Sequence, residues 1–277
     1  LHLSLRRQRQ MCIRDSLYTE YWGLTRKPFE NAPDPDFFYQ SPEHEEAYIR
    51  MLYALKENKG AALLTGEYGS GKTLLIRVLV QELEEEKNEI AFLDNPRWTP
   101  AELYQDILYQ LGEDVPDESH AGLMRTLGEV FYRNFSKEKN TLIIIDEAQL
   151  IRDEAIFEEL RLLLNFQLND RFLLTLFLVG QPELRERVMA IPQLEQRLSI
   201  KFHLHTLDRE NTHNYIAHRL RVAGREENMF TEEAMDFIYH SSHGTPRRIN
   251  NICDMCLLVG FGRRANEIDL DIAKSAV

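Results

Sequence analysis

Short apolar runs bounded by turn residues alternate with segments of helical periodicity along most of the chain. In the segment that follows residue 153, for example, apolar side chains recur at three- and four-residue spacing, as on one face of a helix. Strands that alternate with helices form βαβ units, so we expect an α/β fold with a parallel sheet covered on both faces. The expected strands are 61–65, 90–94, 142–146, 173–179 and 200–204, and the expected helices are 41–56, 73–86, 100–111, 123–135 and 153–168.

The pattern changes after residue 204, where helical segments follow one another without strand-like runs between them. Asp208 and Thr231 are the expected N-caps of the first two of these helices, because short polar side chains accept hydrogen bonds from the first free amides of a helix. The pattern therefore predicts a small all-helical module. Its helices are expected at 208–223, 231–241 and 246–260.

The segment before the first helix is irregular and rich in turn residues. It combines several aromatic side chains with Pro28, Pro33 and Pro35, which is typical of a linker packed onto a surface. The whole pattern predicts three parts. They are a linker at 17–40, a three-layer αβα core at 41–205 and a helical lid at 206–277.

Composition and charge narrow the classes of function. With 277 residues, of which 43% are hydrophobic, the chain can bury a full-sized core. The formal charge is −12, and residues 1–16 contribute +3, so the rest carries −12 − 3 = −15, which argues against nonspecific coating of DNA. No apolar run reaches the ~18–20 residues that span a bilayer. Three cysteines do not suggest a disulfide framework, so we expect a cytoplasmic protein.

A glycine-rich sequence joins the first expected strand to the next helix. Residues 66–73 read GEYGSGKT and fit the pattern G-x-x-x-x-G-K-[ST] between a strand and a helix. Glycines let the backbone turn its N–H groups inward around an anion at a helix N-terminus. Lys72 can then reach the β- and γ-phosphates of a nucleotide, and the Thr73 hydroxyl can ligate Mg²⁺. The expected phosphate-binding residues are Gly66, Glu67, Tyr68, Gly69, Ser70, Gly71, Lys72, Thr73 and Leu74.

Two carboxylates, Asp146 and Glu147, emerge at the C-terminal end of the third expected strand, where residues 141–147 read TLIIIDE. Ligands bind at the carboxyl ends of parallel strands, and adjacent residues there point in different directions, so the two acids can divide the work. We expect Asp146 to hold Mg²⁺ together with Thr73. Glu147 is expected to polarise the attacking water as a general base.

These two motifs resemble those of the AAA+ class of P-loop ATPases, and the flanking residues are similar to the ATPase module of the ExeA/GspA family, the general secretion pathway A proteins. The similarity runs from about residue 18 nearly to the C-terminus, in order and without large gaps. It rests on the segments YWGLTRKPFENAPDPDFFYQSPEHEEA, TGEYGSGKT, DEAQ, ELRLLLNFQ, LVGQPELRERV, LEQRLSIKFHL and GTPRRINNICD.

The resemblance implies ATP and Mg²⁺ as cofactors and adds roles to three residues. Gln181 stands where such proteins place sensor 1, and Arg247 stands at the sensor 2 position, where it would also bind the nucleotide. Arg197 matches the place of an arginine finger that a neighbouring subunit supplies, with Arg185 and Arg187 as competing candidates. The resemblance also implies that the linker at 17–40 packs near the nucleotide. The catalytic set is then Lys72, Glu147, Gln181, Arg197 and Arg247.

The resemblance further implies a homo-oligomer, with a hexameric ring as one arrangement, that hydrolyses ATP to drive assembly or remodelling of a secretion or envelope complex. An association with the inner membrane would come through partners. The alternative is a DNA-associated regulator that resembles the TniB/TnsC transposition ATPases, which the charge of −15 disfavours. A nucleotide-gated scaffold with negligible turnover is disfavoured because the position of Glu147 is intact. Family members carry a membrane segment and a cell-wall-binding region after this module, so we expect a stand-alone relative or a chain whose C-terminal part is missing.

The first sixteen residues differ in character from everything that follows. They carry four arginines, and QMCIRDS at 10–16 is the translation of one end of a common transposase-based sequencing adapter. The family resemblance begins only afterwards, and position 1 is Leu where a start would give Met. We therefore expect residues 1–16 to be a sequencing scar, so that neither their charge nor Cys12 belongs to the native protein.

Overall fold

The structure is a computed structural model that describes residues 18–114, 118–168 and 171–277. Residues 1–16, which we expect to be foreign to the protein, lie outside the described residues. The chain divides into two compact units. One consists of Pro42–Tyr68 and Lys72–His205, and the other consists of Thr206–Val277 with Gly69–Gly71 and the described residues up to Ser41.

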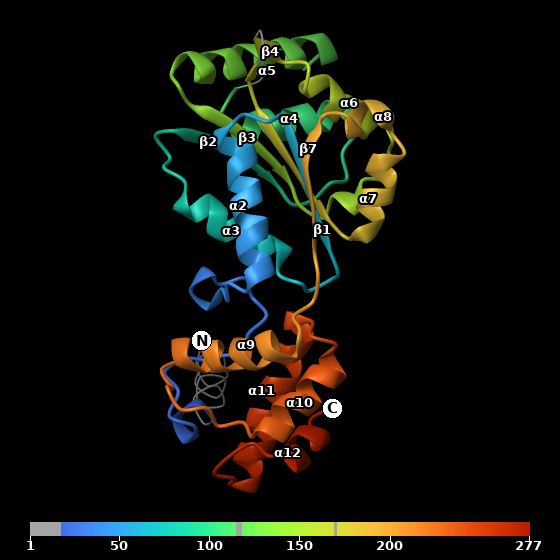
Figure 1. The fold of residues 1–277 in the computed structure, drawn as a ribbon. Coiled ribbons are helices and arrows are strands. Elements are labelled where there is room, and N and C mark those ends of the chain that lie inside the picture. The colour runs from blue at the N-terminus through green and yellow to red at the C-terminus, as the bar shows by residue number, and fades with distance from the viewer. Residues whose placement is uncertain (1–17, 115–117, 169–170) are drawn as a thin grey trace, which may run out of the picture. The chain divides into compact units, whose positions relative to one another are not determined.

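The first unit is built on a five-stranded parallel sheet (Figure 1). The strand order is β2-β3-β6-β1-β7, so β6 lies between β1 and β3. This confirms the predicted α/β fold with a parallel sheet. The strands are β1 (Ala61–Gly66), β2 (Asn88–Leu93), β3 (Asn140–Ile145), β6 (Thr175–Gly180) and β7 (Leu198–Leu204).

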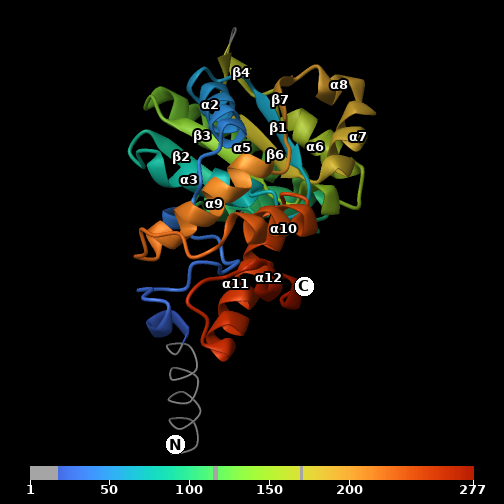
Figure 2. The same cartoon turned by 60° about the horizontal axis from the view of Figure 1, so that its bottom comes forward.

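Helices cover both faces of this sheet, as Figures 1 and 2 show. Alternate strand residues such as Leu63 and Ile143 belong to one core cluster with the helices α4 to α8. Helices α2 and α3 pack on β1 and β6, whose intervening residues, such as Leu64, are also buried. The helices are α2 (Pro42–Lys56), α3 (Lys72–Glu82), α4 (Pro100–Gln110), α5 (His120–Ser136), α6 (Ala155–Leu163), α7 (Pro182–Met189) and α8 (Pro192–Glu195).

The predicted helix at 153–168 is wrong in its last turn. Helix α6 ends at Leu163, and the chain then forms an antiparallel hairpin of β4 (Gln167–Leu168) and β5 (Arg171–Phe172). The Arg197 guanidinium donates hydrogen bonds to the Leu164 carbonyl at 2.7 Å and to Asn165 Oδ1 at 3.0 Å. A side chain remote in sequence therefore satisfies the end of the helix, which local periodicity does not reveal.

After residue 205 the second unit forms four helices, three of which lie at the predicted positions. Asp208 accepts a hydrogen bond from the Asn211 amide, and Thr231 accepts one from the Ala234 amide, so both act as N-caps. The fourth helix was not predicted. The helices are α9 (Arg209–Val222), α10 (Glu232–Ser242), α11 (Pro246–Arg263) and α12 (Leu270–Ser275).

The linker forms part of the hydrophobic core of this helical unit. Trp22, Phe29 and Phe37 are at most 4% exposed and pack with residues of α9, α10 and α11, and a 3₁₀ turn, η1 (Pro35–Phe37), ends the segment. The buried Arg219 guanidinium donates to the carbonyls of Pro28 and Glu30 and stacks on Phe37 at 4.6 Å. The aromatic side chains of the linker are therefore part of the core, and a buried arginine binds its main chain.

Within the described residues, none of the helices combines the length and the apolar character needed to cross a membrane.

Candidate nucleotide-binding site

The glycine-rich loop leaves the end of β1 and enters α3 at Lys72. Gly69 and Gly71 adopt φ values of +80° and +101°, in the left-handed region that side chains with a Cβ rarely enter. The two glycines are therefore required by the backbone itself. This is the chain reversal that the GEYGSGKT pattern predicts.

The Lys72 ammonium folds back over the loop. Its Nζ donates to the carbonyl oxygens of Gly66 at 2.8 Å and of Glu67 at 2.9 Å. Burial lowers the pKa of Lys72, and the negative charges of Glu147, Asp146 and Glu67 oppose that shift. A cation is thus held inside the loop, where it can meet the phosphates of a nucleotide.

Asp146 lies directly after β3 and is 4% exposed. Its Oδ2 accepts a hydrogen bond from the Thr73 hydroxyl at 2.7 Å, and its Oδ1 accepts one from the Glu147 amide at 2.9 Å. Burial raises the pKa of the Asp146 carboxyl, and these two hydrogen bonds and the charge of Lys72 oppose the shift. The structure therefore brings the two predicted metal ligands together.

This pair of oxygens fits Mg²⁺. The ion prefers hard oxygen ligands and is commonly held by one or two protein groups, with water and substrate phosphates completing its shell. In the described part of the chain, no cluster of three or more His, Cys, Asp or Glu side chains forms a self-sufficient metal site. Thr73 and Asp146 match the smaller donor set that a nucleotide-bound Mg²⁺ needs.

Glu147 has a strained backbone at the start of the 3₁₀ turn η2 (Ala148–Leu150). Its φ of +52° lies in the left-handed region, which costs a non-glycine residue of the order of 1 kcal/mol or more. The two acids have different side-chain partners: Asp146 accepts from Thr73, and Glu147 does not share that partner. The Glu147 carboxylate accepts a hydrogen bond from Gln149 Nε2 at 2.5 Å.

Gln181 follows β6 and is the residue before α7. Its backbone N–H donates to Gln149 Oε1 at 3.0 Å. Gln149 therefore touches both the predicted base and the predicted sensor. Gln149 has no predicted role, although it is the last residue of the DEAQ segment and lies two positions after Glu147.

The three arginines considered as fingers differ in their surroundings. Arg197 holds the end of α6, as described above, and lies 5.9 Å from the Phe172 ring. Arg187 donates to the carbonyls of Gln149 and Ile151. The Arg185 side chain is exposed and makes no hydrogen bond or ion pair with any described residue. Two of the candidates are thus engaged within their own chain.

Arg247 lies in the helical unit, as the second residue of α11, and its side chain is exposed. Its predicted role toward the nucleotide stays a prediction, as does that of the linker.

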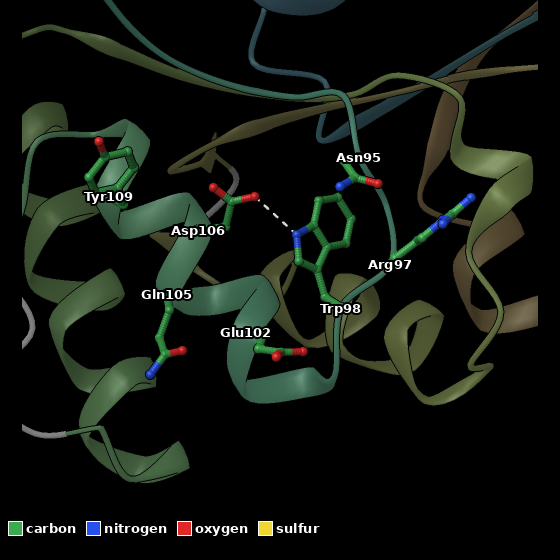
Figure 3. Close-up of a pocket in the computed structure, with 7 residues that line it drawn as sticks. All are labelled: Asn95, Arg97, Trp98, Glu102, Gln105, Asp106 and Tyr109. Carbon is green, nitrogen blue, oxygen red and sulfur yellow. Dashed lines mark hydrogen bonds between the residues drawn. The ribbon is translucent and has the colours of Figure 1, made fainter.

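A separate pocket lies at the connection from β2 to α4 (Figure 3). The Trp98 indole N–H donates to Asp106 Oδ2 at 3.0 Å, and Thr99 and Glu102 form a reciprocal cap that fixes the start of α4. None of the predicted site residues lines this pocket, so it is not part of the candidate site. It is lined by Asn95, Arg97, Trp98, Glu102, Gln105, Asp106 and Tyr109.

A phosphate loop after β1, an acidic pair after β3 and an additional strand between those two define a P-loop ATPase of the AAA+ class. A family model described as an AAA domain matches residues 55–188. General secretion pathway protein A of Aeromonas hydrophila is 36% identical over 257 residues, which make up 91% of this chain and 46% of that protein. The chain belongs to the AAA+ P-loop ATPases of the ExeA/GspA family.

Solved structures support the same fold. The ORC2 protein of Aeropyrum pernix, in ADPNP–ADP complexes, matches with a TM-score of 0.66 at 18% identity, over 91% of this chain and 70% of that one. The ORC1 protein of the same organism, in complex with DNA, matches with a TM-score of 0.66 at 18% identity, over 91% of this chain and 68% of that one. The chain spans less than half of the length of the secretion protein that it matches.

The burial of Asp146 leads to a test that separates stability from binding. A carboxyl whose pKa is raised by folding makes the folded state less stable as pH rises above the ordinary value of 3.8. Asp146→Asn removes the buried charge, keeps an oxygen that accepts from the Glu147 amide, and can donate from its NH₂ group to the Thr73 hydroxyl oxygen. We expect the nucleotide-free variant to melt about 2–4 °C above the wild type at pH 7, with the difference disappearing near pH 3.8. Calorimetry across that pH range measures it.

The higher melting temperature of Asp146→Asn should disappear when ATP and Mg²⁺ are added, because the metal loses a charged ligand. The apparent affinity for ATP should fall roughly tenfold, so ATP should raise the melting temperature of the variant less than that of the wild type. Asp94→Asn, at an exposed aspartate beyond β2, is the matched control and should change neither quantity. A nucleotide-free Asp146→Asn variant that melts below the wild type at neutral pH would contradict the inference.

Proposed function

We propose that this chain binds and hydrolyses ATP, and that in an oligomer it drives assembly or remodelling of a secretion or envelope complex. The observation that carries the proposal is the 2.7 Å contact between Thr73 and Asp146, beside the buried ammonium of Lys72. This contact joins a hydroxyl beyond β1 to a carboxylate beyond β3, with β6 between the two strands and the Lys72 cation close by. That combination suits a triphosphate with its metal ion better than it suits an uncharged ligand.

In this proposal each residue has one task. The loop amides and Lys72 hold the phosphates, and Thr73 with Asp146 would hold Mg²⁺, which neutralises charge on the phosphate oxygens when bound. Glu147 accepts a proton from a water molecule whose oxygen attacks the γ-phosphorus. The bond from that phosphorus to the bridging oxygen breaks, and ADP and phosphate leave. Gln181 orients the water, while Arg197 and Arg247 stabilise the charge that develops.

Two substitutions test hydrolysis directly. Lys72→Ala removes the cation and should weaken ATP binding roughly 10- to 100-fold. Glu147→Gln keeps the shape of the side chain but cannot accept the proton, so it should bind ATP normally and lower kcat about 10²- to 10⁴-fold. Binding is measured by titration with a fluorescent ATP analogue, and turnover by phosphate release.

Glu154→Gln is the matched control for the second variant, because it makes the same change of charge at an exposed glutamate before α6. Its turnover should equal that of the wild type. Tight ATP binding by Lys72→Ala would overturn the phosphate-loop assignment, and normal hydrolysis by Glu147→Gln would remove that residue as the base.

The arginine finger needs a test that separates action in trans from packing in cis. Arg197→Ala should bind ATP normally and lose roughly 10³-fold of the hydrolysis that depends on protein concentration. Asn165→Ala is the control, because it removes one partner of Arg197 and leaves the guanidinium in place. If Arg197 acts only within its chain, both variants will be destabilised alike and hydrolysis will keep its dependence on concentration. In that case Arg185, which is exposed, becomes the candidate to substitute next.

The proposed partner follows from the relative's name, general secretion pathway protein A, and from the 91% of this chain that the similarity covers. We place the activity in the cytoplasm, where ATP is available.

The alternative, a regulator that acts on DNA, would need clustered basic residues to neutralise phosphates, and residues 17–277 carry a net charge of −12 − 3 = −15.

ATP turnover measured with and without duplex DNA, at several salt concentrations, tests this choice of partner. We expect no stimulation and no salt-dependent binding. Stimulation that weakens steeply as salt rises would instead support the DNA-associated function, because release of counterions from DNA gives binding that signature.

A further inference from the structure

The side chain of Gln149 lies between the ends of two neighbouring strands of the sheet. Its Nε2 donates to Glu147 Oε2 at 2.5 Å, and its Oε1 accepts from the Gln181 backbone N–H at 3.0 Å. Glu147 follows β3, whereas Gln181 follows β6. One amide therefore connects the proposed base to the strand end that carries the proposed sensor.

The orientation of this amide is fixed by chemistry. A backbone N–H can only donate a hydrogen bond, so the Gln149 oxygen must face Gln181. The NH₂ group is then left to face Glu147, whose ionised carboxylate can only accept. Both contacts fail if the amide is rotated by half a turn, which makes the observed arrangement the only one that satisfies the two partners.

Two further features hold Gln149 in place. A Cβ at position 180 would lie 2.5 Å from Gln149 Oε1 and 2.8 Å from Leu184 Cδ2, so glycine there leaves the space that the amide occupies. The Gln149 carbonyl accepts a hydrogen bond from Arg187 Nη1 at 3.2 Å. The residue is thus anchored through its main chain as well as its side chain.

We propose that Gln149 is a positioning residue, which sets the direction of the Glu147 carboxylate and couples it to the end of β6. By engaging Oε2, it leaves Oε1 of Glu147 as the oxygen that takes the proton from water. A shift of Gln181 when nucleotide binds would be passed through the amide to the base. The inference rests on the proposed function, since it assigns a means of control to the same hydrolytic step.

Three variants test the role of Gln149. Gln149→Ala removes the link and should lower kcat roughly 10- to 100-fold, while KM for ATP stays within about twofold. Gly180→Ala leaves Gln149 in the sequence but fills its space, and should reproduce that loss. Gln149→Glu places a second carboxylate against Glu147, and the two should share a proton, moving the acidic limb of the kcat–pH profile to higher pH. A purely structural role would not produce that pH shift.

Gln110→Ala, at an exposed glutamine at the end of α4, is the matched control and should leave kcat unchanged. Melting curves and the affinity for an ATP analogue are recorded for every variant, so that loss of folding is separated from loss of positioning. The failure of the two ideas can be distinguished. If the wild type does not hydrolyse ATP, the proposed function is wrong and the inference falls with it. If the wild type hydrolyses ATP and Gln149→Ala matches its kcat and pH profile, the inference alone is wrong.

Discussion

The hydrogen bond from the Thr73 hydroxyl to Asp146 joins the two halves of the site. The two residues are 73 positions apart in the chain, yet their oxygens lie 2.7 Å apart. Thr73 follows β1 and Asp146 follows β3, and β6 lies between those strands, so the bond forms only when the strands pair in this order. A buried carboxylate without partners costs several kcal/mol. This bond and the one from the Glu147 amide therefore offset part of the free-energy cost of burying the Asp146 carboxylate.

Several groups of the site lower the stability of the folded protein. Burial lowers the pKa of Lys72 and raises that of Asp146, which means that both charges would be more stable in water. Glu147 adds strain through its positive φ. The opposite charges of Lys72 and the two acids offset part of this cost. Such a concentration of unfavourable terms is expected where a bound phosphate and its metal ion later supply the missing interactions.

The sheet, most helices and the phosphate loop could be predicted because each is encoded locally. Strands buried on both faces appear as apolar runs, and the loop needs glycines where φ is positive. The hairpin after α6 could not be predicted, because it depends on Arg197, a residue remote in sequence. The inward packing of the linker depends likewise on Arg219. The position of Gln149 between two sites could not be predicted for the same reason, since it follows from which strand ends become neighbours.

The register of the sheet explains why a residue after β3 can respond to events at the phosphate loop. Gly180, the last residue of β6, is paired with Thr65, the residue before the loop, and Leu178 is paired with Ile145, the residue before Asp146. The end of β6 therefore borders the loop on one side and the acids on the other. Because packed strands do not slide independently, a displacement at this end must move either the loop or the acids. The Gln149 amide lies on the acidic side and contacts Glu147 itself, so in the proposed coupling a displacement of β6 would reach the base directly.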